Sequence, residues 1–154
     1  MQHAEPLLQI YRHPYAADLP FPRYESASAA GIDLRSAEND FDLLPGSRKL
    51  VQTGLRLAIP DGWAGLVRSR SGLFAKFGVL AMHGTIDADY RGDLMVGLYL
   101  TPGAGPVRIA RGDRIAQLLL APTPQAKLAE VMLSDFDQLS TARGTGGFGS
   151  TGTH

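Results

Sequence analysis

Glycine and proline interrupt this chain so often that only short secondary-structure elements fit between them. The 154 residues include 18 glycines and 10 prolines, and few windows keep the apolar period of a helix. Short apolar runs bounded by turn signals such as LPGS, IPDGW and TPGAGP are typical of strands. The pattern predicts an all-β fold, a sandwich or barrel. Its expected strands span residues 7–12, 50–59, 63–68, 94–101, 115–121 and 128–133.

One segment has the character of a helix: SGLFAKF at 71–77, with Ser71 as its expected N-cap. A chain of this length is typical of one domain with a core of its own. The C-terminal segment differs, because five of the residues 144–154 are glycine and Phe148 is its one large apolar side chain. Such a segment cannot by itself offset the entropy of ordering. We therefore expect a β core over residues 1–138 and a flexible glycine-rich arm over residues 139–154.

Charge and cysteine content narrow the classes of function. Fifteen basic residues balance fifteen acidic ones, so no overall field draws the chain to nucleic acid or to an anionic membrane. The absence of cysteine excludes disulfides and thiolate chemistry. The apolar runs are much shorter than the roughly 20 residues of a membrane span, and the first 20 residues lack a signal-peptide pattern. We expect a cytoplasmic protein with neither nucleic acid nor a membrane as partner.

Five stretches carry polar residues that a β scaffold does not need: AGIDLRSA (30–37), RSRSGL (68–73), HGTIDADYRGD (83–93), RGDRIAQL (111–118) and RGTGGFGSTG (143–152). Taken singly, each has a structural explanation. Asp33 suits a turn, and an Asp113–Arg114 pair suits an exposed surface. The third stretch is excluded as a calcium loop, because Arg91 and Leu98 would occupy two of its ligand positions.

Together, the five stretches resemble the five motifs of the trimeric dUTPase family (deoxyuridine triphosphate pyrophosphatase), in the family's order. The segments AGIDL, RSGL, GTIDADYRGD, RGDRIAQL and RGTGGFGSTG carry the likeness. The resemblance implies a distorted β-barrel or jelly-roll-like fold and a homotrimer with active sites at the subunit interfaces. It also implies hydrolysis of dUTP to dUMP and pyrophosphate by attack of water on the α-phosphorus. That reaction keeps uracil out of DNA and supplies dUMP for dTMP synthesis.

The third motif would supply the catalytic base and the nucleoside pocket. Asp87 matches the family's carboxylate that activates the attacking water. It follows Ile86 in what is expected to be a hairpin, and the backbone near His83 and Gly84 would read the uracil. His83 departs from the family, which often has a small residue or proline there. Tyr90 matches the ring that lies against the deoxyribose and leaves no room for a 2′-hydroxyl.

The second, fourth and first motifs would hold the triphosphate. Ser71 and Gly72 match residues that contact the bridge between the α- and β-phosphates, and Arg70 and Gln117 match further polar contacts to the phosphate chain. The family binds Mg²⁺ on the three phosphates. Asp33 matches the carboxylate that holds this ion through water, which suits the reluctance of magnesium to lose its hydration shell.

The fifth motif lies in the glycine-rich arm and implies a function for it. The resemblance implies that the arm folds over the bound nucleotide. Arg143 would pair with the γ-phosphate and Phe148 would stack on the uracil. Gly149, Ser150 and Thr151 would bring backbone amides and hydroxyl donors to the phosphates.

Two other functions are compatible with parts of the sequence. A dCTP deaminase is built on a related scaffold, but it places a glutamate in the strand after the third motif, where this chain has Gly97. A nucleotide-binding module without activity is the second, although an anion such as Asp87 beside phosphates would weaken pure binding. An ordinary β domain with an unstructured tail is a further alternative. It does not explain why Arg143 and Phe148 stand in a glycine-rich segment.

Overall fold

The structure, a computed structural model, describes residues 5–142, 144 and 145 of the chain. It divides into two compact units, Met1–Pro124 and Gln125–His154. The first unit holds the strands β1 (Gln9–Arg12), β2 (Ile32–Arg35), β3 (Phe41–Leu43), β4 (Arg48–Ala58), β5 (Trp63–Arg68), β6 (Val79–Ala81), β7 (Gly84–Ile86), β8 (Asp93–Leu100), β9 (Val107–Ile109) and β10 (Arg114–Pro122). It also holds the 3-10 helix η1 (Pro14–Ala16) and the helix α1 (Ser71–Phe77), while α2 (Leu133–Asp137) belongs to the second unit.

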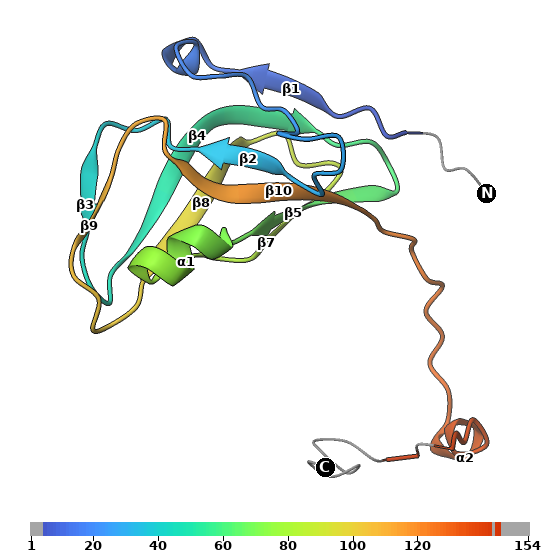
Figure 1. Ribbon diagram of the computed structural model, residues 1–154. Helices are drawn as coiled ribbons and strands as arrows, with labels where there is room; N and C mark the ends of the chain where they lie inside the picture. Colours follow the sequence, from blue (N-terminus) through green and yellow to red (C-terminus); the bar gives the residue numbers. More distant parts are fainter. Residues whose placement is uncertain (1–4, 143, 146–154) are drawn as a thin grey trace. The chain divides into compact units, whose positions relative to one another are not determined.

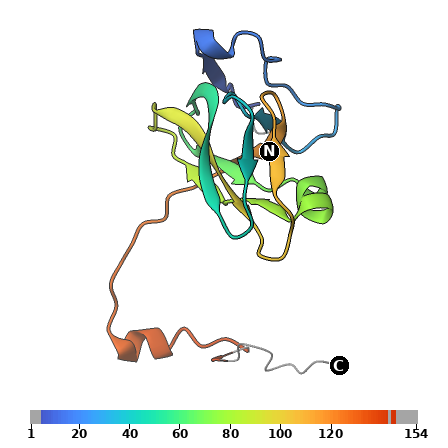
Figure 2. The same cartoon turned by 90° about the vertical axis from the view of Figure 1, so that its left-hand side faces the viewer.

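Two four-stranded antiparallel sheets make up most of the first unit. Their strand orders are β1-β4-β8-β6 and β2-β10-β5-β7, and β3 pairs with β9 in a small third sheet. Figures 1 and 2 show the two larger sheets on either side of a common interior. That interior is filled by buried apolar side chains from both sheets, among them Leu34, Val51, Val67, Val96, Leu98 and Leu118. The predicted all-β fold is confirmed.

The strands that carry the candidate site alternate between core and solvent. In β2, Ile32 and Leu34 are buried, whereas Asp33 and Arg35 lie on the other face and remain partly exposed. Successive side chains of a strand point to opposite faces, so a buried apolar set fixes which residues face outward. The core therefore directs the polar residues of the motifs to the outside of the β2-β10-β5-β7 sheet.

The Ser69 side chain connects the two larger sheets. Its hydroxyl donates a hydrogen bond to the backbone oxygen of Ala81 at 2.8 Å and accepts one from the backbone N–H of Ala81 at 3.0 Å. Ser69 directly follows β5, and Ala81 ends β6 in the other sheet. One hydroxyl thus pairs with both the N–H and the C=O of Ala81, two groups that a neighbouring strand would pair in a regular sheet.

Five of the six expected strand segments are strands, and the sixth prediction is wrong. Residues 128–132 form no strand, and residue 133 begins α2. A strand needs a neighbour for its backbone groups, and no described strand pairs with this segment, whose Leu128 is 95% exposed. The boundary of the arm at residue 139 stays a prediction.

The expected helix has the bounds of α1, but its N-cap is Arg70 and not Ser71. The backbone oxygen of Arg70 accepts the first helical bonds from Leu73 and Phe74, so Ser71 already lies inside the helix. Within the part of the chain that the structure describes, no helix is long and apolar enough to cross a membrane.

Candidate active site

The first, second and fourth motifs meet on the outer face of the β2-β10-β5-β7 sheet. Gln117 of β10 pairs with Asp33 of β2 on one side and with Arg68 of β5 on the other. Directly paired residues of neighbouring strands face the same side of a sheet. The row therefore unites residues that are up to 84 positions apart in sequence, and two of them, Asp33 and Gln117, were predicted site residues.

Two arginines surround the Asp33 carboxylate. The Arg70 Nε lies 3.1 Å from Oδ1, and the Arg114 Nη1 lies 3.3 Å from Oδ2. The Asp33 side chain is only 9% exposed. Arg70 also donates a hydrogen bond from Nη1 to the backbone oxygen of Arg114 at 3.1 Å. We call Asp33, Arg68, Arg70, Arg114 and Gln117 the arginine cluster. The arginine cluster holds three guanidinium groups and one carboxylate, so its net charge is positive.

One oxygen of this carboxylate retains hydrogen-bonding capacity. Asp33 Oδ1 is buried and accepts no hydrogen bond from the residues that the structure describes, and Arg70 Nε is likewise without an acceptor. Their separation of 3.1 Å is that of an ion pair, but the N–H does not point at the oxygen well enough for a hydrogen bond. Beside the cluster, Ser71 and Gly72 open α1 and are exposed.

The third motif forms a separate pocket on the same unit. After β7 ends at Ile86, a turn runs from Asp87 to Tyr90, and it is closed by a hydrogen bond from the Tyr90 N–H to the Asp87 backbone oxygen at 3.2 Å. Asp87, Tyr90 and Asp93 line an open pocket of about 290 Å³, which we call the turn pocket. The expected hairpin is wrong in one respect. The strands on either side of the turn, β7 and β8, belong to different sheets.

Two carboxylates line the turn pocket, and only one of them is engaged. Asp93 Oδ1 is 2.6 Å from Arg56 Nε, which donates to it, and 2.8 Å from His13 Nε2. The Arg56 guanidinium, and after it His13, hold the pKa of Asp93 below its usual range. Asp87 is exposed, and its carboxylate has no hydrogen-bond donor or ion-pair partner among the described residues. Asp87 is therefore the carboxylate of this pocket whose oxygens have no partner among the described residues.

The Tyr90 ring lies across the end of its own turn. Its hydroxyl donates a hydrogen bond to the backbone oxygen of Asp93 at 3.1 Å. The ring crosses Gly92 so closely that a Cβ there would lie 2.3 Å from Tyr90 Oη and 2.5 Å from Cζ. A glycine at position 92 is thus required for this placement, and the ring forms one wall of the pocket.

The arginine cluster and Asp87 lie apart within one chain. Gly84 pairs with Val67, next to the Arg68 row, whereas Asp87 lies three residues further along the chain, past the end of β7. At the rise of an extended strand, this separates Asp87 from Gly84 by about 10 Å. His83 precedes Gly84 in an exposed loop and lines a different pocket with Arg48 and Ser69. The predicted arm residues Arg143, Phe148, Gly149, Ser150 and Thr151 lie outside the described residues.

A model of the dUTPase family matches residues 17–152. The chain belongs to the dUTPase family. The deoxyuridine 5′-triphosphate nucleotidohydrolase of Methylocella silvestris is 52% identical, over 97% of this chain and 94% of that protein. The enzyme of the same name from Thermobifida fusca is 49% identical, over 89% of this chain and 75% of its own. That name denotes a dUTP diphosphatase, so the predicted family and enzyme class are confirmed.

Solved structures of dUTPases share the fold of this family member. The dUTPase of Staphylococcus bacteriophage 80alpha with dUPNHPP superposes with a TM-score of 0.80 at 29% identity, covering 96% of this chain and 99% of that one. A mutant dUTPase from phage phi11 of S. aureus, described for its structural Mg(II) ion, gives a TM-score of 0.74 at 25% identity. It covers 81% of this chain and 96% of its own.

The structure adds residues to the dUTPase motifs that the sequence does not single out. Arg114 belongs to the arginine cluster, while His13 and Arg56 hold Asp93. His13 and Arg56 are separated from Asp93 by 80 and 37 positions, so no local pattern connects them. The fourth-motif Arg111 is structural, because its guanidinium binds Asp18 through two hydrogen bonds of 3.0 and 2.8 Å.

Proposed function

We propose that this chain hydrolyses dUTP to dUMP and pyrophosphate by attack of a water on the α-phosphorus, with Asp87 as the general base. The observation that carries the proposal is the contrast in the turn pocket, where Asp93 accepts a hydrogen bond from Arg56 and Asp87 has no partner among the described residues. A free carboxylate can accept the proton of the attacking water, whereas one held by a guanidinium is a weaker base. The cellular role would be to keep uracil out of DNA and to supply dUMP for dTMP synthesis, in the cytoplasm as the sequence predicts.

The arginine cluster suits the triphosphate. Its positive charge and its planar donors favour phosphate oxygens, because guanidinium groups bind such anions through charged hydrogen bonds. Arg70 and Gln117 would contact the phosphate chain from the outer face of the sheet. Ser71 and Gly72 would contact the bridge between the α- and β-phosphates, where no Cβ at Gly72 obstructs an approach.

Mg²⁺ fits this site as an ion brought by the substrate. Among the residues that the structure describes, no three His, Asp or Glu side chains gather into a metal site. Asp33 Oδ1, buried and without a hydrogen bond, can accept one from a water on an ion that the phosphates bind. When bound, such an ion would offset charge on the phosphates, and Asp33 would orient it through water.

Base and sugar recognition belong to the third motif. The backbone around His83, Gly84 and Ile86 would face the uracil, and a mismatched base would leave buried donors or acceptors unpaired at about 1–3 kcal/mol each. The Tyr90 ring would stand where a ribonucleotide carries its 2′-hydroxyl. Its placement close over Gly92 would make it a steric barrier to that hydroxyl.

The active site would be shared between chains of a homotrimer. Within one chain the arginine cluster lies at the Arg68 end of β5, whereas Asp87 follows the far end of β7, and a second copy would bring the two halves onto one nucleotide. The outer face of β4, β8 and the loop after β6 supports association, because Leu50, Met82 and Met95 are 61%, 55% and 41% exposed there. A contiguous apolar patch of this kind marks an interaction surface.

The glycine-rich arm would complete the site. Arg143 would pair with the γ-phosphate and Phe148 would stack on the uracil, with Gly149, Ser150 and Thr151 as further donors. Removal of residues 143–154 should abolish most turnover and leave the melting temperature of the β core nearly unchanged. A truncated chain with full activity would exclude this role.

A dCTP deaminase is disfavoured by the packing of β8. A Cβ at Gly97 would lie 2.7 Å from Met82 Sδ and 3.1 Å from Met82 Cγ. The Met82 N–H also donates a hydrogen bond to the Gly97 backbone oxygen at 2.7 Å. The position at which that enzyme needs a glutamate is therefore filled by a neighbouring side chain.

The test is pyrophosphate release from dUTP, dCTP, dTTP and UTP, each with Mg²⁺ and with a chelator. We expect fast release from dUTP alone, lost when the chelator is present. Ammonia release from dCTP would identify a deaminase instead. Binding of dUTP without release of pyrophosphate would identify a nucleotide-binding module.

A further inference from the structure

We propose that Asp93 and His13 are positioning residues, which hold the Tyr90 ring and thereby set the discrimination against ribonucleotides. The inference rests on the proposed function, since it concerns the sugar that Tyr90 contacts. Neither residue needs to touch the nucleotide, because each acts through Tyr90.

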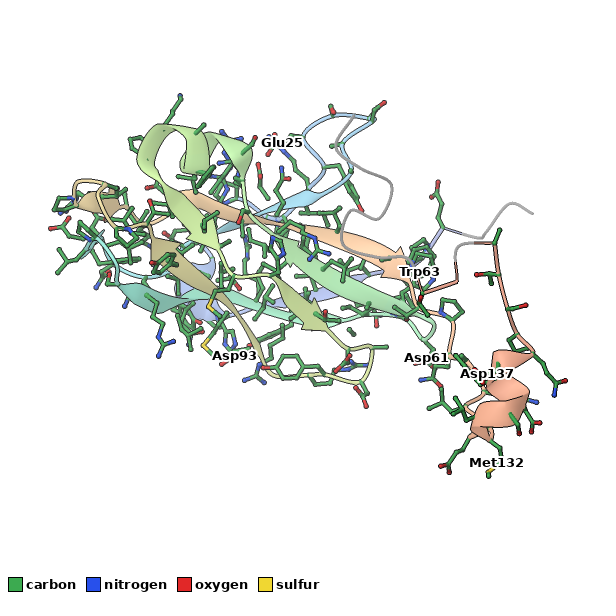
Figure 3. All side chains as sticks on the ribbon, turned by 90° about the horizontal axis from the view of Figure 1, so that it is seen from below. Glu25, Asp61, Trp63, Asp93, Met132 and Asp137 are labelled. Atoms are coloured by element: carbon green, nitrogen blue, oxygen red, sulfur yellow. The ribbon has the colours of Figure 1, made fainter. Side chains whose placement is uncertain are left out.

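Asp93 fixes the end of the turn. It is the first residue of β8 and is labelled in Figure 3. Its carboxylate joins Arg56 of β4 at 2.6 Å and His13, just after β1, at 2.8 Å. Three segments from distant parts of the sequence therefore converge on one oxygen atom. The Asp93 side chain is therefore held by one partner on β4 and by another just after β1.

The connection from Asp93 to Tyr90 is direct. The tyrosine hydroxyl donates to the backbone oxygen of Asp93, so a shift of this residue moves the acceptor that orients the ring. Gly92, between them, has no side chain, which allows the ring to lie close to the backbone. The hydrogen bond to Asp93 is the one hydrogen bond of the Tyr90 side chain among the described residues. Without a fixed Asp93, the ring is free to swing away from the sugar.

His13 is built into its place. Its ring packs between the edge of Tyr11, at a centroid distance of 5.0 Å, and the face of Tyr15, at 5.1 Å. Its backbone N–H donates to the Gly54 oxygen at 2.9 Å. Its side chain is only 18% exposed. An ion pair on the surface contributes little free energy when two mobile side chains must be ordered to form it. Here that entropy loss is smaller, because the histidine is already confined.

The primary test is Asp93→Asn, assayed for kcat/KM with dUTP and with UTP. We expect the ratio of kcat/KM for dUTP to that for UTP to fall about tenfold. When the ring moves, the space for a 2′-hydroxyl opens, so kcat/KM for UTP rises relative to that for dUTP. His13→Ala should lower the ratio in the same direction, and His13→Gln, which keeps a donor, should restore part of it. Asp42→Asn, at an exposed aspartate of β3 that lies 3.9 Å from Arg108, is the matched control and should leave the ratio unchanged.

A double variant separates positioning from general damage to the fold. Tyr90→Phe removes the hydroxyl that connects the ring to Asp93. Asp93→Asn should then have no further effect on the ratio in the Tyr90→Phe background. If Asp93→Asn does not fold, the same comparison is made with His13→Ala.

The failures can be told apart. Wild-type protein that does not cleave dUTP would overturn the proposed function. Wild-type protein that cleaves dUTP, together with variants that lower turnover of dUTP and UTP equally, would overturn the positioning role alone. Additive effects of Asp93→Asn and Tyr90→Phe on the ratio would overturn it as well.

Discussion

Asp87 and Asp93 have the same side chain and line the same pocket, yet their partners give them different chemistry. Asp93 is bound by Arg56 and His13, whereas Asp87 has no partner among the described residues. Asp87→Asn keeps the size of the side chain and removes its basicity. We expect kcat to fall by a factor of about 10²–10⁴ with little change in the binding of dUTP, measured by single-turnover kinetics and calorimetry. Asp89→Asn, in the same turn, is the control, and near-normal kcat in Asp87→Asn would remove that residue from the role.

Arg111 links acid stability to a single side chain. Its guanidinium lowers the pKa of Asp18, and this is the shift that a change of the Arg111 side chain removes. The lowered pKa of Asp40 comes from the Arg111 backbone N–H and from the Arg108 side chain, which such a change retains. A carboxyl with a lowered folded-state pKa stabilises the fold above about pH 4, where a free aspartate titrates, and this contribution is lost as the pH falls through the folded value. Arg111→Met should therefore melt lower at pH 7 and lose less stability on acidification than the wild type. Melting curves from pH 7 to pH 2.5 test this, with Arg23→Met as control, and parallel curves would contradict it.

Among the elements, one hydroxyl joins the end of β5 to β6 in the other large sheet. Ser69→Ala leaves the N–H and the C=O of Ala81 without the partners they have now. An unpaired buried backbone group costs about 1–3 kcal/mol, so the melting temperature should fall by several degrees. Ser26→Ala, in an exposed loop, is the control. An unchanged melting temperature in Ser69→Ala would show that water replaces the hydroxyl at this junction.

The sequence predicts elements well where one face of a strand is buried over several residues. β4, β5, β8 and β10 follow from their apolar runs, since core packing within one chain decides them. β6, β7 and β9 have three residues each, too few for a period to show. Residues 128–133 have a strand-like pattern but no strand partner in the described chain. Their prediction fails because an apolar pattern indicates that a segment tends to be buried, but it does not identify the strand or surface that the segment packs against.

The same limit separates the predicted from the unpredicted parts of the site. Asp33, Asp87 and Tyr90 stand in motifs that can be read locally, and the structure puts Asp33 beside Gln117 and Tyr90 beside Asp87 as expected of neighbours on one scaffold. His13 and Arg56 act on Asp93 from far along the chain. Their role depends on strand register, which the sequence does not encode in any short segment.

At the scale of the whole molecule, the proposed homotrimer assigns the arginine cluster and Asp87 of one chain to two different active sites. Mixing two inactive variants tests this. Asp87→Asn keeps the arginine cluster, and Arg70→Ala keeps the base. If each site takes Arg70 from one chain and Asp87 from another, random trimers of the two variants contain about a quarter of intact sites, since each half is chosen independently.

Refolding the two variants together should therefore restore about a quarter of the wild-type rate of pyrophosphate release, whereas each refolded alone stays inactive. A mixture of Asp87→Asn with Asp87→Ala is the control, because no pairing of these chains contains a base. Recovery in the first mixture and none in the second would assign the two halves to different chains. No recovery in either, with mixed trimers shown by mass spectrometry, would mean that each chain builds its site alone and brings Asp87 to its own arginines by a movement of the turn.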